Sequence, residues 1–196
     1  MRGQIPNTYL ALGMPICEWA LGGPELRAYH DREWGRAAHD DRTLFEFLVL
    51  ETAQAGLSWA TILRKREGYR RAFAGFDPDR VARFTVASER RLRADAGIVR
   101  NAAKIRSAIG NARRFRAVRD EAGSFWDHLA TFHDGATLSA DLRRRGFSFV
   151  GPVVCTSLLE AVGLIDGHAP GCPATRPAPV PDRRREAARG SPRAPR

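Results

Sequence analysis

Apolar residues recur along the chain at the three- and four-residue spacing of amphipathic helices, and no segment shows the sustained alternation of a strand between hairpin turns. The clearest helical repeat consists of Ile105, Ala108, Ile109, Ala112 and Phe115. The predicted helices span residues 25–34, 43–53, 59–72, 89–94, 105–115, 125–132, 138–145 and 153–162, with a shorter one opening at residue 78. We therefore predict an all-α fold of short helices joined by turns.

Several of these helices begin beside a residue that commonly caps a helix N-terminus. Asp40 or Asp41 precedes the helix at 43–53, and Ser58 precedes the next one. Asp77 is followed by a proline, which is favoured at the first helical position. Ser88 is expected to begin the helix at 89–94. These polar residues locate the predicted boundaries more sharply than the apolar spacing alone.

The stretch from residue 44 to residue 59 has an unusual pattern. Glu51 directly follows a nearly all-apolar run, and a buried carboxylate without a partner is strongly unfavourable. The helix then breaks at Gly56, so that the apolar Leu57 lies on a turn, and Trp59 opens the next helix. A buried acid, an aromatic face and a protruding apolar residue together predict a pocket for a flat, polar or cationic ligand.

Composition narrows the class of protein. A chain of 196 residues suits one domain or two small lobes, and it has no apolar run of the roughly 20 residues that a membrane span needs. Three cysteines without a secretory signal favour a reducing cytoplasm. The net charge is +10, which favours a polyanionic partner without naming one. No Gly-rich phosphate loop, Ser-centred elbow or metalloprotease motif is present.

The segment from Asp95 to Asn101 joins two predicted helices around Gly97 and has the pattern of a helix-hairpin-helix. Ile98 and Val99 are expected to anchor the turn in the core. Free amides at the start of the next helix could then bind a DNA phosphate without reading sequence. Glycine is also common in ordinary joins between helices, so the spacing alone leaves both interpretations open.

Two pairs of soft ligands lie at opposite ends of the chain: Cys17 and His30 near its start, His168 and Cys172 near its end. Two thiolates and two imidazoles can form a closed, structural zinc site, which would tie the two ends together. The separation between the pairs also allows four unrelated residues. Cys155 lies in an apolar helix and is expected in the core.

In combination, these residues resemble the DNA-3-methyladenine glycosylase I family of the helix-hairpin-helix glycosylase superfamily. The resemblance extends from about residue 17 to residue 172, and the combination is far more specific than any single motif. The matching segments are Cys17-Glu18-Trp19, Tyr29-His30-Asp31-Arg32-Glu33-Trp34-Gly35, Leu50-Glu51 through Trp59, Asp95-Ala96-Gly97-Ile98, Lys104-Ile105, Ile109-Gly110-Asn111-Ala112-Arg113, Arg145-Gly146-Phe147, Phe149-Val150-Gly151, and Gly163-Leu164 with His168 and Cys172.

The resemblance implies two helical lobes around a base-binding cleft, with structural Zn²⁺ on the four soft ligands. It implies that Glu51 is the catalytic group and hydrogen-bonds 3-methyladenine, and that Tyr29, Trp59 and Trp19 line the pocket. The residues that it places at the DNA are Gly56, Leu57, Gly97, Ile98 and Lys104. The implied partner is double-stranded DNA with alkylated bases, in the bacterial cytoplasm and nucleoid, and we expect a monomer without membrane contact.

The resemblance covers only part of the chain and is not complete within it. We predict an N-terminal extension at residues 1–16, a glycosylase domain at 17–173, and a disordered tail at 174–196 that is rich in Pro, Arg and Ala. Thr52-Ala53 departs from the more polar sequence expected of the family at that point, which could alter hydrogen bonding in the pocket.

Three functions are compatible with these residues. A monofunctional glycosylase is preferred for two reasons. The chain has two lysines, Lys65 and Lys104, and neither is well placed to form a Schiff base. In addition, no acid beyond the hairpin has the setting of a catalytic aspartate. A catalytically inactive DNA-binding module of the same fold is the alternative. A zinc-stabilised helical interaction protein is the third, and it alone predicts no salt-dependent affinity for DNA.

Overall fold

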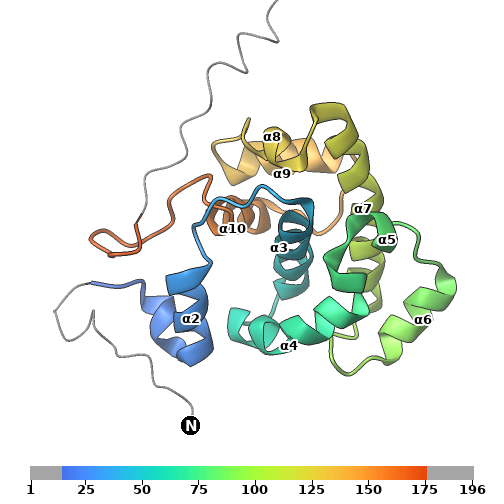
Figure 1. The fold of residues 1–196 in the computed structure, drawn as a ribbon, viewed down its shortest axis with the longest axis horizontal. Helices are drawn as coiled ribbons and strands as arrows, with labels where there is room; N and C mark the ends of the chain where they lie inside the picture. Colours follow the sequence, from blue (N-terminus) through green and yellow to red (C-terminus); the bar gives the residue numbers. More distant parts are fainter. Residues whose placement is uncertain (1–14, 176–196) are drawn as a thin grey trace, which may run out of the picture.

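The computed structural model describes residues 15–175, and every regular element within them is helical, which confirms the predicted fold class (Figure 1). In chain order the elements are η1 (Glu18–Gly22), α2 (Pro24–Arg32), α3 (Asp41–Gln54), α4 (Trp59–Ala72), η2 (Ala74–Phe76), α5 (Pro78–Val81), α6 (Val86–Ala94), α7 (Ala102–Ala122), α8 (Phe125–Leu129), α9 (Gly135–Arg144) and α10 (Pro152–Ala161). None of these helices is long and apolar enough to cross a membrane.

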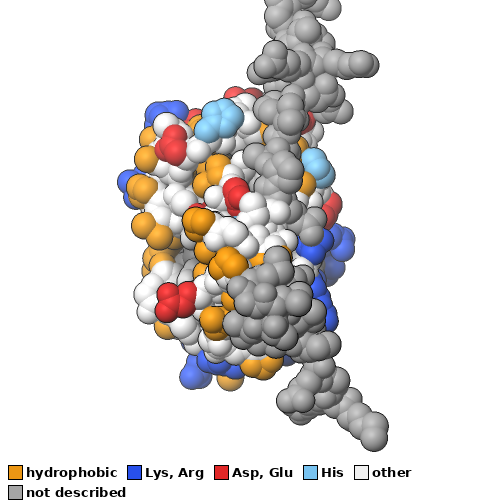
Figure 2. Space-filling view, turned by 90° about the vertical axis from the view of Figure 1, so that its left-hand side faces the viewer, with side chains coloured by type: hydrophobic (Ala, Val, Ile, Leu, Met, Phe, Trp, Pro, Cys, Tyr) orange, Lys and Arg blue, Asp and Glu red, His pale blue; other side chains and the backbone are white. Residues whose placement is uncertain are grey.

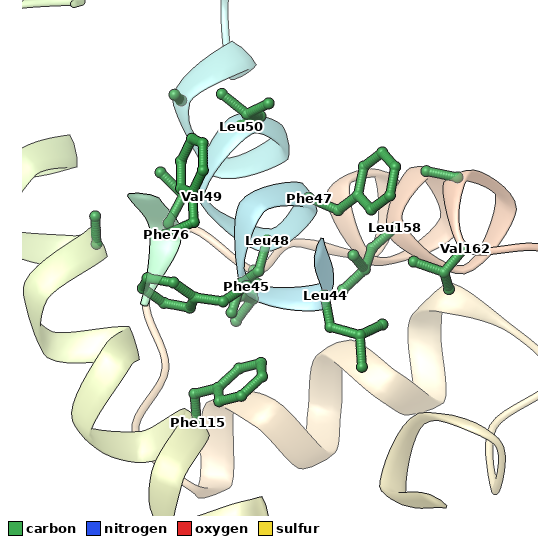
Figure 3. Close-up of a cluster of buried hydrophobic side chains, with 14 of the residues drawn as sticks. Leu44, Phe45, Phe47, Leu48, Val49, Leu50, Phe76, Phe115, Leu158 and Val162 are labelled. Atoms are coloured by element: carbon green, nitrogen blue, oxygen red, sulfur yellow. The ribbon is translucent and has the colours of Figure 1, made fainter. Parts of the chain in front are cut away.

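Helix α3 is the centre of the fold and is buried on every side, from Leu44 to Ala53. Figure 3 shows Phe47 directed toward Leu158 of α10, while Phe45 lies on the side of Phe115 of α7. The rings of Phe45 and Phe115 meet edge to face with centroids 5.5 Å apart. A helix that is apolar all round belongs in a core rather than at a surface. Helices α2 and α10 lie on one side of α3, and α5, α6 and α7 lie on the other (Figure 1).

The capping residues expected from the sequence occupy their predicted places with one exception. The side chains of Asp40, Ser58 and Asp77 accept hydrogen bonds from the first-turn amides of α3, α4 and α5. The prediction that Ser88 begins a helix is wrong, because α6 already starts at Val86. Thr85 precedes that helix, and the hydroxyl of Ser88 accepts the N–H of Thr85 from within the first turn. Ser88 thus stabilises the helix start without being its first residue.

The turn between α6 and α7 packs against α4 more closely than most side chains would allow. A Cβ on Gly68 of α4 would overlap the carbonyl of Gly97, so two glycines meet where the hairpin crosses this helix. The N–H of Gly97 donates to Asp95, and Ile98 is buried as predicted. Asn101 accepts the amides of residues 103 and 104, so its side chain already satisfies part of the N-terminus of α7.

The side of the molecule that carries α2 is shown in Figure 2. Apolar side chains are spread over this face with isolated carboxylates among them, and Lys and Arg gather near its margins. The described chain therefore does not concentrate its basic charge on this face. The predicted extension, apart from residues 15 and 16, and the predicted tail beyond residue 175 lie outside the described residues.

Candidate functional site

A cavity of about 430 Å³ opens where η1, α2, α3, α4 and α10 converge. Its volume is in the range of sites that enclose small organic ligands. The lining is Trp19, Leu26, Tyr29, Trp34, Glu51, Gln54, Ser58, Trp59, Ala60, Ser157 and Glu160. All four residues that the sequence predicted for a pocket are therefore brought together, although they come from four different elements.

Glu51 lies in this cavity near the end of α3, with 4% of its surface exposed. It forms no hydrogen bond or ion pair with any residue that the structure describes. Burial and then the charge of Glu160 raise the pKa of Glu51 to about 8. In the empty cavity this carboxyl therefore holds a proton at neutral pH, whereas a bound cation would favour its ionised form.

Two polar atoms of aromatic side chains are also buried without a hydrogen-bond partner among the described residues. The hydroxyl of Tyr29 and the indole N–H of Trp59 are buried, and neither has a hydrogen-bond partner within residues 15–175. Burial, and next the charge of Glu51, raise the pKa of Tyr29 well above its usual range, so its hydroxyl remains a donor. The ring of Tyr29 lies 5.3 Å from that of Trp59 and 6.2 Å from that of Trp19, between centroids. Aromatic faces and orphaned polar atoms together suit a flat ligand with a polar edge.

The turn after α3 projects an apolar side chain beside the cavity. Gly56 has φ of 77°, and a Cβ there would have nothing within 4 Å, so glycine serves the left-handed backbone rather than close packing. The next residue, Leu57, is 39% exposed. Gln54 and Ser58 on either side of the turn both line the cavity. The turn thus holds an exposed apolar side chain next to the mouth of the pocket.

Lys104, predicted to lie at DNA, reaches back to this turn. Its ammonium donates to the carbonyls of Ala53 and Ala55, at 2.8 Å and 2.6 Å. These carbonyls lie at the C-terminus of α3, where a positive charge is favoured by the helix dipole. Burial lowers the pKa of Lys104 from its usual value. The first turn of α7 therefore supports the residues that carry the exposed leucine, and contact of Lys104 with DNA stays a prediction.

The four soft ligands form one cluster that joins the two ends of the described chain. Their ligand atoms all lie within 4.8 Å of one another. Sγ of Cys17 is 3.6 Å from Nδ1 of His168, and Sγ of Cys172 is 3.5 Å from Nε2 of His30. A tetrahedral zinc ion with its usual bond lengths separates sulfur and nitrogen ligands by about 3.5 Å. The residues present thus fit a metal ion in both type and spacing.

The surroundings of the cluster fit the same interpretation. Nδ1 of His30 is 2.8 Å from the carboxylate of Asp31, which fixes the ring and leaves Nε2 for a metal. The backbone N–H of Ala169 donates to Sγ of Cys17. The ring of Trp34, which lines the cavity, lies 4.5 Å from that of His168. The cluster therefore supports one wall of the pocket through aromatic contacts.

Sequence reasoning missed several residues of the cavity wall. Gln54 and Ser58 flank the recognised turn, and Ser157 and Glu160 lie on α10, a helix that the sequence presents as apolar. In the sequence, the polar residues at 157 and 160 within a largely apolar helix could have indicated that one edge of this helix faces a cavity. Thr52, suspected of altering the pocket, donates its hydroxyl to the carbonyl of residue 49 and does not line the cavity.

Comparison with known proteins gives consistent results. A family model described as methyladenine glycosylase matches residues 19–138 and 133–175. The chain is 39% identical over 179 residues to DNA-3-methyladenine glycosylase 1 of Escherichia coli, covering 81% of this chain and 96% of that protein. It is 34% identical to the DNA-3-methyladenine glycosylase of Haemophilus influenzae, with 80% and 96% covered.

Solved structures agree with the sequence relatives. A crystal structure of 3-methyladenine DNA glycosylase I superposes with a TM-score of 0.75 at 38% identity, covering 81% of this chain and 98% of that one. A structure of 3-methyladenine DNA glycosylase I from Staphylococcus aureus, which describes the recognition of 3-methyladenine, superposes with a TM-score of 0.77 at 34% identity. The match covers 83% of this chain and 98% of that one.

Proposed function

The chain belongs to the methyladenine glycosylase family, and we propose that it is a DNA-3-methyladenine glycosylase I, which hydrolyses the N-glycosidic bond of 3-methyladenine in alkylated double-stranded DNA during base excision repair. One observation carries this assignment beyond the family. Glu51 is a buried carboxyl without a partner among the described residues, in a cavity with aromatic walls. Such a group is unfavourable in the empty protein, and a cationic base flipped from DNA would satisfy it.

The chemistry needs little acid catalysis. Methylation at N3 gives adenine a positive charge and makes it a good leaving group. Glu51 is the catalytic group, since its carboxylate complements the charge and hydrogen-bonds the polar edge of the base. Tyr29, Trp59 and Trp19 line the site, and their faces favour a cation. Normal adenine lacks the charge and leaves poorly, so selectivity comes from chemistry as well as fit.

Binding of the duplex is assigned to two turns. The turn with Gly56 and Leu57 inserts an apolar side chain into the space that the flipped base leaves. The hairpin with Gly97 and Ile98 contacts the phosphate backbone, and Lys104 adds a positive charge beside it. These contacts position the DNA without reading its sequence. They need only one copy of the chain, in keeping with the expected monomer, in the bacterial cytoplasm and nucleoid where the substrate is found.

Zn²⁺ is the metal proposed for the cluster. Cys17, His30, His168 and Cys172 would hold it, and with four protein ligands it would leave no open position for a substrate, so its contribution would be structural. Because His30 follows Tyr29 directly in α2, an ordered His30 also orders Tyr29 at the cavity. The domain from residue 17 to residue 173 would thus be closed at both ends by its own ligands.

Release of free base from methylated DNA tests the proposal directly. Chromatography should detect 3-methyladenine, and metal analysis of the same preparation should find about one zinc ion per chain. Intact strands on a denaturing gel, before alkaline treatment, would support a monofunctional enzyme, and cleaved strands would exclude it. Salt-dependent binding to DNA without base release would instead favour an inactive DNA-binding module.

A further inference from the structure

The cavity contains a second acid, Glu160 of α10, that the proposed mechanism leaves without a role. It lines the same space as Glu51 and is about half-buried. It forms no hydrogen bond or ion pair with another residue of the described chain. No Lys or Arg belongs to the described lining, so Glu160 and Glu51 are its only groups that can carry charge near neutral pH.

The carboxyl of Glu160 lies against the turn that leads to the metal cluster. A Cβ added to Gly167 would lie 2.6 Å from Cδ of Glu160 and 2.8 Å from its Oε1. The carboxyl therefore packs directly on the backbone of residue 167, where a larger side chain would displace it. Ser157, almost one helical turn earlier on α10, lines the same cavity. Helix α10 thus presents one polar edge to the pocket, opposite the end of α3.

The two carboxyls share one cavity and have no cation among the described lining residues. Burial, and next the charge of Asp166, raise the pKa of Glu160. The charge of Glu160 in turn adds to the burial that raises the pKa of Glu51. A positive charge placed between them would relieve both penalties. Walls formed by Trp19, Tyr29 and Trp59 favour a flat organic cation, whose charge is attracted to the aromatic faces.

We propose that Glu160 is a specificity-determining residue, which together with Glu51 makes the cavity select a base that carries a positive charge over a neutral base of similar shape. This inference rests on the proposed glycosylase function and deepens it. The substrate base in DNA is a cation. When its bond to C1′ breaks, the electron pair stays with the base, which becomes neutral, while water adds to C1′ and releases a proton. The charge that holds the substrate is therefore absent from the product, which favours release.

Binding of two small ligands tests this selection without DNA. The probes are 3,9-dimethyladeninium, which is a cation at about pH 8, and free 3-methyladenine, which is neutral at that pH. Tryptophan fluorescence reports binding, because Trp19, Trp34 and Trp59 line the cavity. The isosteric change Glu160→Gln should weaken binding of the cation about tenfold and alter binding of the neutral base less than about twofold. Glu160→Asp should restore most of the preference.

The matched control is Glu67→Gln, which removes one charge from an exposed side chain of α4. It should leave both affinities unchanged. An equal loss of both ligands in Glu160→Gln, or an unchanged preference, would overturn the inference. Zinc content and melting temperature equal to those of the wild type are required of each variant before its two affinities are compared. Base release by the wild-type protein is measured in parallel: without it the proposed function fails, whereas the charge preference and its dependence on Glu160 are judged on binding alone.

Discussion

Helix α3 carries two buried acids that differ in one respect. Glu46 is 5% exposed and Glu51 is 4% exposed. The carboxylate of Glu46 lies 2.5 Å from Nε of Arg66 and 3.0 Å from the guanidinium of Arg70, both on α4. Arg66 also reaches Glu33, at 2.6 Å. Glu51, five residues further along α3, has none of these cations and faces the cavity instead.

The difference teaches that burial of an acid does not mark a functional site unless the acid also lacks a partner. A buried carboxylate with two guanidinium groups is a satisfied part of the structure. A buried carboxyl without a partner raises the free energy of the empty protein, and this cost is recovered only when a ligand binds. Glu46 therefore joins α3 to α4, whereas Glu51 is available for the base.

The largest expected effect separates the two acids by activity. In Glu51→Gln the side chain cannot become a carboxylate and balance the positive charge of the bound base. We therefore expect excision of 3-methyladenine to fall at least about 100-fold. Binding of undamaged DNA should change little, because that contact is to phosphates. Single-turnover base release and a filter-binding assay measure the two quantities. Excision near the wild-type rate would remove Glu51 from its assigned role.

The second expected effect is on stability, where Glu46 is expected to matter more than it does for activity. Glu46→Gln leaves the half-buried guanidinium of Arg66 with a weaker partner, and we expect it to lower the free energy of unfolding by about 3 kcal/mol. The folded fraction should still excise the base within a few-fold of the wild type. Urea denaturation of the zinc-loaded protein measures the loss. A stable variant with greatly reduced excision would contradict the separation between the two roles.

The contrast between these acids also shows which features of the site can be predicted from the sequence. Glu51 stands at the end of an apolar run and attracted notice there, whereas Glu46 lies inside the same run and did not. Both need a partner, but the partner of Glu46 comes from the next helix, twenty residues along the chain. The apolar run predicts burial for Glu51, and it led to no prediction for Glu46. Only the packing of α3 against α4 shows which of them is paired.

Elsewhere the predictions succeeded where the interaction joins residues that are close together in the sequence. The capping residues of α3, α4 and α5 follow from short-range hydrogen bonding. The spacing of the four soft ligands left their contact open, and only the folded chain brings the two pairs together. Glu160 was missed because the direction in which α10 presents its polar edge depends on tertiary packing. Gly97 was expected to serve a tight turn, but its close approach to Gly68 is a contact between distant segments.

A third effect appears in the dependence of stability on pH. The pKa of Glu51 is raised from 4.5 to about 8, by burial and then by Glu160, so the folded state binds more protons than the unfolded state between these values. Stability therefore falls as pH rises through this window, by about 1.4 kcal/mol per unit for one group.

Between about pH 6 and pH 7.5 the wild type should lose about 2 kcal/mol more than Glu51→Gln, in which this carboxyl is absent. Glu46→Gln is the control, and it should keep the wild-type slope because Glu51 is intact. Glu160 and Tyr29, which also face the cavity, remain in all three proteins. Urea titrations at several pH values measure the slopes. Equal slopes in the wild type and Glu51→Gln would show that Glu51 finds a partner in solution.

The smallest effect concerns the end of α3 beyond Glu51. Lys104→Met removes two hydrogen bonds to the carbonyls of residues 53 and 55, and we expect a loss of about 1 kcal/mol in stability. Because these carbonyls precede the turn with Leu57, KM for alkylated DNA should rise more than kcat falls. If Lys104 positions that turn, the slope of log affinity against log salt should be unchanged. A slope smaller by about one would mean that Lys104 instead contacts a phosphate directly.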